Sequence, residues 1–138
     1  MAETAESKVK KQIKALLADY HVNTPATAGF GKSGQLDFVC CIEGVYVAIE
    51  AKSIHSPYGK NGPTQLQWDE IDNIGKNGGI AMCIDESNID TLRKFLHHMQ
   101  QGAVGTARYL AVVTLTRFER PKLDPETPTQ PTKRNRRV

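Results

Sequence analysis

Residues 36–52 of the chain read LDFVCCIEGVYVAIEAK. The two apolar halves, 36–42 and 45–51, are rich in Val, Ile and aromatic residues and are separated by Glu43-Gly44, a pattern typical of a β-hairpin. If Glu43 and Gly44 form a two-residue loop, the numbers of directly opposed residues sum to 87. This rule pairs Ile42 with Val45, Val39 with Ala48, and Asp37 with Glu50.

Two acidic residues therefore face each other at the open end of the predicted hairpin. Opposed residues point to the same face, with Cβ atoms about 4.5–5.5 Å apart. Lys52 lies two residues beyond Glu50 and shares this face. Carboxylates placed this way repel unless a cation lies between them, and oxygen ligands suit Mg²⁺ or Mn²⁺. The alternative is that Asp37 and Glu50 lie on a solvent-exposed edge and simply pair with Lys52.

The rest of the chain predicts helices and strands around this hairpin. Apolar residues at spacings of three and four indicate helices, and short Val/Ile-rich runs between Gly, Pro and Asn indicate strands. We expect helices at 4–20, 64–76 and 87–100, with Ser87 as the N-cap of the last, and further strands at 26–30, 79–84 and 108–118. A chain of 138 residues with this order predicts one α/β domain, a mixed central sheet flanked by helices.

Charge is distributed unevenly along the chain. Residues 1–120 hold thirteen basic and thirteen acidic side chains, so the net charge of +3 arises entirely in residues 121–138. We expect a domain at 1–120 and a disordered, basic, Pro/Thr-rich tail at 121–138. Such a tail attracts phosphate non-specifically. The alternative interpretation is that the tail serves only to keep the protein in solution.

The composition also bears on the cellular compartment. No apolar run approaches the roughly 20 residues that span a bilayer, and residues 1–11 lack the apolar core of a secretory signal. The three cysteines are odd in number, two of them adjacent, so we expect no disulfide framework. These features predict a cytoplasmic protein without a membrane partner.

The hairpin and its flanks together resemble a known family. Gly34-Gln35-Leu36-Asp37, then twelve intervening residues and Glu50-Ala51-Lys52, resembles the signature of the PD-(D/E)XK nucleases, with Leu36 in place of the Pro. Closer still is the likeness to the virus-type replication-repair nuclease (VRR-NUC) domain. The features that carry this likeness are an opening helix with Glu6, a Gly-rich turn before Asp37, the sequence Thr64-Gln65-Leu66-Gln67, and Gly78-Gly79 before the next strand.

The resemblance implies a role for each matching residue. Asp37 and Glu50 would bind the metal with the backbone carbonyl of Ala51, and Glu6 would join them directly or through a metal-bound water. Lys52 would position the attacking water and offset negative charge in the transition state. A Gln from the second helix is expected near the site, and its spacing to Gly78-Gly79 favours Gln67, with Gln65 as the second choice.

The resemblance implies a restriction-endonuclease-like fold and a Mg²⁺- or Mn²⁺-dependent DNA endonuclease. Its substrate would be structured DNA, such as branched DNA or four-way junctions, and a viral or phage origin is compatible with it. Two alternatives stay open: a restriction-type or exonuclease member of the same superfamily, and a non-catalytic DNA-binding module on this fold.

The same resemblance implies a homodimer. One active site per chain can serve only one DNA strand at a time, and a four-way junction is two-fold symmetric, so a two-fold dimer would present one site to each of two strands. We expect one of two surfaces to form the contact. One is the apolar face of the helix at 87–100, made of Leu92, Phe95, Leu96 and Met99. The other is the predicted strand 108–118. A monomer that buries all of these residues is the alternative.

Overall fold

The computed structural model describes residues 3–25, 34–56 and 62–121. The strand expected at 26–30 and nearly all of the basic tail lie outside the described residues. Along the chain the elements are α1 (Ala5–Leu16), β1 (His21–Asn23), β2 (Phe38–Ile42), β3 (Val45–Ala51), α2 (Gln65–Lys76), β4 (Ile80–Ile84), α3 (Ile89–Gln100) and α4 (Val104–Thr116).

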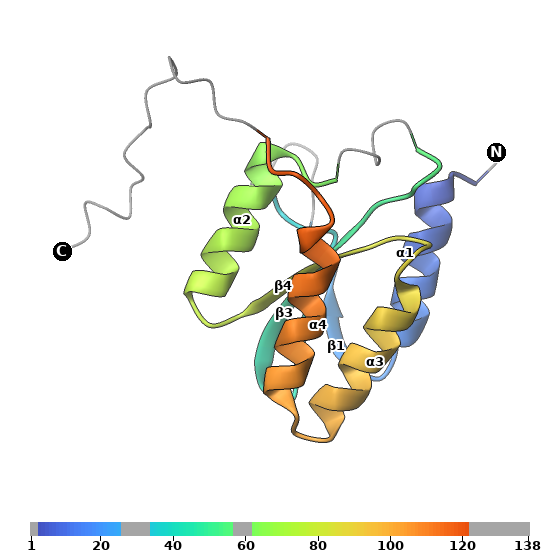
Figure 1. Cartoon of the computed structure of the whole chain (residues 1–138). Helices are drawn as coiled ribbons and strands as arrows, with labels where there is room; N and C mark the ends of the chain where they lie inside the picture. The colour runs from blue at the N-terminus through green and yellow to red at the C-terminus, as the bar shows by residue number, and fades with distance from the viewer. Residues whose placement is uncertain (1–2, 26–33, 57–61, 122–138) are drawn as a thin grey trace, which may run out of the picture.

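The four strands form one mixed sheet in the order β1-β2-β3-β4. The pairs β1–β2 and β2–β3 are antiparallel, and β3–β4 is parallel. Helices flank this sheet, with α2 on one side and α1 and α3 on the other (Figure 1). The predicted α/β class with a mixed central sheet is confirmed.

The hairpin has the predicted register. Ile42 pairs with Val45, and the pairing continues to Phe38 opposite Ile49. Glu43 and Gly44 have φ angles of 50° and 79°. A two-residue hairpin loop whose backbone follows the strand twist requires positive φ at both positions, which Gly adopts freely and Glu does not. The loop therefore stores a little strain at Glu43 and fixes which residues oppose each other.

The sheet has a hydrophobic core on each face. The larger core joins alternate residues of the strands to α1, α3 and α4, and the smaller core joins Ala48 and Ala81 to α2. The face that α2 covers is also the face onto which Glu50 and Lys52 project, because they alternate with Ile49 and Ala51 of the larger core. The polar site thus continues the smaller core toward the end of β3.

The segment 108–118, predicted as a strand, is instead part of helix α4. This helix lies along the outer edge of β4. The Thr114 hydroxyl accepts a hydrogen bond from the Cys83 backbone N–H at 3.1 Å, and Arg108 donates to the carbonyls of Gly78 and Gly79. A helix that satisfies backbone groups of an edge strand protects that edge from pairing with another chain.

Two smaller predictions also need correction. β1 lies at His21–Asn23, in a segment expected to be a loop. The N-cap of α3 is Asn88 rather than Ser87. The Asn88 side chain bonds Asp85 and Cys83, so it closes the turn between β4 and α3.

The apolar face of α3 is not available for a dimer contact. Its four predicted contact residues are all buried in the larger core: Leu92, Phe95, Leu96 and Met99. They pack in one core with residues of the sheet, α1 and α4, so a single copy of the chain covers them. Of the two expected surfaces, only the segment 108–118 retains exposed apolar residues, and it presents them from a helix.

Candidate active site

Asp37 and Glu50 are tied to each other through the backbone. The Asp37 N–H donates to Glu50 Oε1 at 3.2 Å, and the Ala51 N–H donates to Asp37 Oδ2 at 2.9 Å. Each carboxylate therefore accepts a hydrogen bond from the strand that carries the other. The structure brings the two acidic residues together as the register predicts.

Glu50 is buried, with 3% of its surface exposed. Its Oε2 accepts a hydrogen bond from Gln67 Nε2 at 2.8 Å and lies 3.3 Å from Lys52 Nζ. Lys52 is also nearly enclosed, with 11% of its side chain exposed. This geometry disagrees with the alternative of a solvent-exposed edge, although the pairing with Lys52 is present.

Burial changes the acidity of Glu50. Loss of water around the carboxylate, followed by the charge of Asp37, raises its pKa from 4.5 to about 8, while Lys52 acts in the opposite direction. A carboxyl group with a raised pKa next to a second carboxylate is a common feature of functional sites, because a purely structural role does not require the cost of burying it.

Asp37 is paired with a residue that the sequence analysis missed. Lys10 Nζ of α1 lies 3.4 Å from Asp37 Oδ1 and 3.8 Å from Glu6 Oε2. Glu6 therefore reaches the site through Lys10, not by direct contact with Asp37. One signal was available in the sequence: Lys10 is four residues after Glu6, so both share a face of the helix.

Gln67, not Gln65, is the glutamine at the site. Gln67 has two functions, because its Oε1 accepts the Thr64 N–H at 2.9 Å while its Nε2 donates to Glu50. Thr64 in turn accepts the Gln67 N–H, which completes a capping box at the start of α2. Gln65 bonds Asp69 on the exposed side of the helix. The cap thus fixes the Gln67 amide against Glu50.

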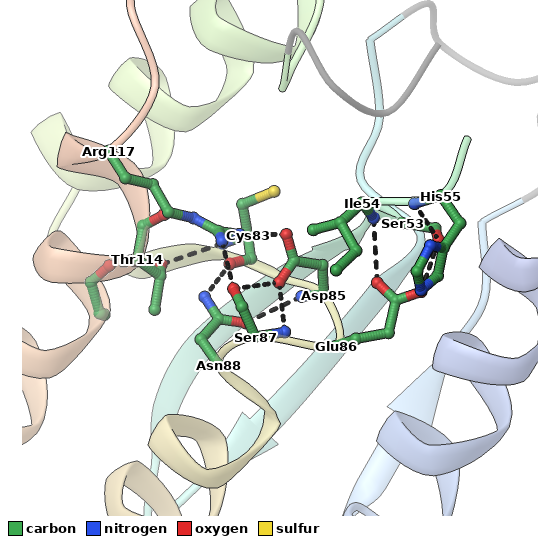
Figure 2. A network of polar contacts seen from close by, with 11 residues as sticks. Ser53, Ile54, His55, Cys83, Asp85, Glu86, Ser87, Asn88, Thr114 and Arg117 are labelled. Atoms are coloured by element: carbon green, nitrogen blue, oxygen red, sulfur yellow. Dashed lines mark hydrogen bonds and ion pairs between the residues drawn. The ribbon is translucent and has the colours of Figure 1, made fainter. Parts of the chain in front are cut away.

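The residues after Lys52 are held by a second carboxylate, that of Glu86 (Figure 2). Glu86 accepts hydrogen bonds from the Ser53 hydroxyl at 2.5 Å and from the Ile54 N–H at 3.0 Å. Burial opposes the charged form, but these hydrogen bonds hold the pKa of Glu86 below its ordinary value. The Lys52 N–H also donates to the Ile84 carbonyl at 3.0 Å. The backbone that presents Lys52 is therefore fixed on both sides.

An ion pair between the buried Asp85 and the exposed Arg117 joins the ends of β4 and α4 in the same region (Figure 2). Arg117 Nη2 lies 2.9 Å from Asp85 Oδ2, and Ser87 donates to Asp85 Oδ1 from both its N–H and its hydroxyl. Although burial of Asp85 works against its charge, Arg117 and Ser87 lower its pKa. The ion pair joins residues about thirty positions apart, so no local sequence pattern predicted it.

The donor set suits a hard divalent cation. Within residues 3–25, 34–56 and 62–121, no group of three or more His, Cys, Asp and Glu side chains forms a metal cluster. Asp37 and Glu50 do form a pair, and the Ala51 carbonyl points to the same side of its strand as the Ala51 N–H that bonds Asp37. Mg²⁺ commonly binds through one or two carboxylates and keeps several waters. These three groups therefore fit Mg²⁺ or Mn²⁺.

Comparisons with known proteins add no assignment. No family model, curated protein or solved structure matches the chain. Within the part of the chain that the structure describes, no helix is long and apolar enough to cross a membrane.

Proposed function

We propose that this protein is a divalent-metal-dependent nuclease that hydrolyses phosphodiester bonds in DNA, with the PD-(D/E)XK fold and the VRR-NUC type of site. One observation supports this most strongly: a buried Glu50 contacts Lys52, Gln67 and the strand end that carries Asp37. A domain that only binds DNA has no use for a buried carboxyl group held next to a second, half-buried one, so this arrangement favours catalysis over the non-catalytic alternative.

Asp37, Glu50 and the Ala51 carbonyl would hold the Mg²⁺ or Mn²⁺ ion. When bound, the ion supplies an acidified water and offsets charge on the phosphoryl oxygens. Hydrolysis of the diester joins a water oxygen to phosphorus and breaks one ester P–O bond, and the water's proton goes to the leaving oxygen, so that a phosphate monoester and an alcohol result. Lys52 is rigidly presented beside Glu50, so its ammonium group can orient the water and stabilise the negative charge that develops.

Gln67 and Glu6 have supporting roles in this proposal. The Gln67 amide is oriented by the helix cap and fixes one oxygen of Glu50, which leaves the other directed to Asp37. Glu6 contacts Lys10, which in turn pairs with Asp37, so Glu6 would support the bound ion from behind these residues rather than as a direct ligand.

The proposed substrate is branched DNA or a four-way junction, and the proposed assembly is a homodimer. Support for the dimer comes from the outward side of α4, where Tyr109, Val112 and Val113 are exposed. Beside them lies a hollow of about 480 Å³ between α2 and α4. If two copies pair about a two-fold axis, the projecting apolar side chains of each copy can enter the hollow of the other.

Cleavage of a substrate panel tests the function. We expect the protein to cut synthetic four-way or flap DNA with Mn²⁺, and Asp37→Ala or EDTA to lower the rate by about a thousandfold or more, because several kcal/mol of transition-state stabilisation are lost. Asp90→Ala is the matched control, since Asp90 is an exposed acidic residue paired with Arg93. Activity of Asp37→Ala equal to that of the unmodified protein would exclude this mechanism.

The same panel separates the alternatives. Preference for duplex ends indicates an exonuclease, and cutting at one sequence in linear duplex indicates a restriction-type enzyme. Binding to junctions without cleavage under any divalent cation would support the non-catalytic module.

A further inference from the structure

Lys10 occupies the open side of the acidic site. Its ammonium group lies 3.4 Å from Asp37 Oδ1 and 3.8 Å from Glu6 Oε2, and 41% of its side chain is exposed. Lys52, by contrast, is enclosed against Glu50 with 11% exposed. The site thus has one enclosed lysine, Lys52, and one lysine at its mouth, Lys10.

We propose that Lys10 changes its partner when the metal binds. It pairs with Asp37 in the metal-free protein, and it contacts a DNA phosphate once the metal occupies Asp37. This inference rests on the proposed nuclease function. Asp37 Oδ2 is already engaged by the Ala51 N–H, so an ion bound to Asp37 and Lys10 compete for the remaining oxygen, Oδ1. The four-carbon stem of lysine lets its charge move without a change in the helix.

The charges of the site support this exchange. Three carboxylates, those of Glu6, Asp37 and Glu50, face two lysines. Metal ligands bind in the ionised form, so with all five groups ionised and a divalent cation bound the site has a net charge of +1, which matches the single negative charge of a phosphodiester. Without Lys10 the metal-bound site would be neutral and would not attract that phosphate. Lys10 therefore provides the charge that makes substrate binding depend on metal binding.

Metal binding without DNA tests the first half of the exchange. Loss of Mn²⁺ signal in electron paramagnetic resonance gives the dissociation constant for the full chain. We expect Lys10→Ala to bind Mn²⁺ about two- to fivefold more tightly, the range that a partly exposed ion pair can contribute. Lys11→Ala is the matched control: Lys11 is adjacent on α1, pairs with Glu3 and is 73% exposed. Its Mn²⁺ affinity is expected to stay unchanged.

DNA binding tests the second half. With Ca²⁺ in place of Mn²⁺ to prevent cleavage, the affinity for a fixed four-way junction is measured across a salt series. Loss of one phosphate contact in Lys10→Ala should lower the affinity and reduce the slope of log affinity against log salt by about one. Lys10→Arg keeps the charge and should retain the slope. Tighter metal binding with weaker DNA binding is the paired result that supports the exchange.

The outcomes separate this inference from the function it rests on. If Asp37→Ala binds Mn²⁺ as well as the unmodified protein, the metal site itself is refuted. If Mn²⁺ binding requires Asp37 but Lys10→Ala changes neither Mn²⁺ affinity nor the salt slope, only the role of Lys10 is overturned. Equal effects of Lys10→Ala and Lys11→Ala on both measurements would also overturn it, since they would reflect the general charge of α1.

Discussion

At the scale of single residues, Glu50 links the stability of the protein to pH. Its pKa is about 8 in the folded protein and near 4.5 in an unfolded chain. Between these values the folded state binds one more proton than the unfolded state, so the free energy of unfolding decreases as pH rises. We expect the metal-free protein to lose up to about 1.4 kcal/mol of stability per pH unit in this window.

Denaturant titrations in EDTA at several pH values between 5 and 9 measure this effect. Glu50→Gln removes the titrating group and should flatten the stability profile over that window. Added Mn²⁺ should also restore stability at high pH in the unmodified protein, because it binds the ionised form. Parallel pH profiles for Glu50→Gln and the unmodified protein would show that Glu50 titrates normally.

The residue scale also shows how far the sequence could predict the site. Asp37, Glu50 and Lys52 were identifiable because strand side chains alternate and a two-residue loop sets the register, so three positions follow from local rules. Lys10 and the Asp85–Arg117 pair were not, because the packing of distant elements decides these contacts. The choice between Gln65 and Gln67 needed the helix cap.

At the scale of elements, the start of α2 joins a helix cap to the site through one side chain. Gln67→Glu keeps the capping box, which accepts Glu as well as Gln, but places a third carboxylate against Glu50 in place of an amide donor. We expect helix content to be retained, while stability in EDTA at pH 9 falls by about 1–3 kcal/mol, as for a lost hydrogen bond to a buried charge.

The matched control for this change is Gln65→Glu, which adds the same charge to the same helix turn beside the exposed Asp69. Its stability at pH 9 should change by less than about 0.5 kcal/mol. Circular dichroism and denaturant unfolding of both variants provide the comparison. A similar loss in both would show that the charge of the helix end matters and that the contact with Glu50 does not.

α4 shows why an element can be predicted with the wrong type. The segment 108–118 is rich in Val, Thr and aromatic residues, which favour strands, yet tertiary contacts determine its conformation. The inward stripe of Ala107, Ala111 and Thr114 follows helical spacing and lets the helix approach the edge of β4 closely. These small residues were the available signal. The predicted strand would have bonded the backbone of β4 along its edge. In the structure the Thr114 hydroxyl of α4 accepts the Cys83 N–H there instead.

At the scale of the whole molecule, the outward side of α4 is the surface that we expect two copies to share. Tyr109 is 68% exposed, and Arg108 is the one charged residue of this helix. Tyr109→Glu should convert the dimer to a monomer, because a carboxylate in an apolar contact loses its water without a partner. Light scattering at micromolar concentration gives the mass, expected near twice 15.3 kDa before the change and near 15.3 kDa after it.

Tyr46→Glu is the control for the dimer, since it adds the same charge at an exposed aromatic residue that belongs to β3 and not to α4. It should leave the mass unchanged. A mass of one chain for the unmodified protein across the micromolar range would refute the dimer and leave the active-site proposal intact.

The two-residue loop at Glu43-Gly44 has a consequence for how this gene can change by insertion and deletion. Glu50 faces Asp37 only because an even number of steps along β3 separates it from Ala48, which projects onto the same face. One codon inserted between Val45 and Glu50 would move Glu50 into the register position of Ala51, so the carboxylate would enter the larger core. A single-residue insertion in this strand, with no site residue altered, would therefore inactivate the protein unless a bulge absorbed it.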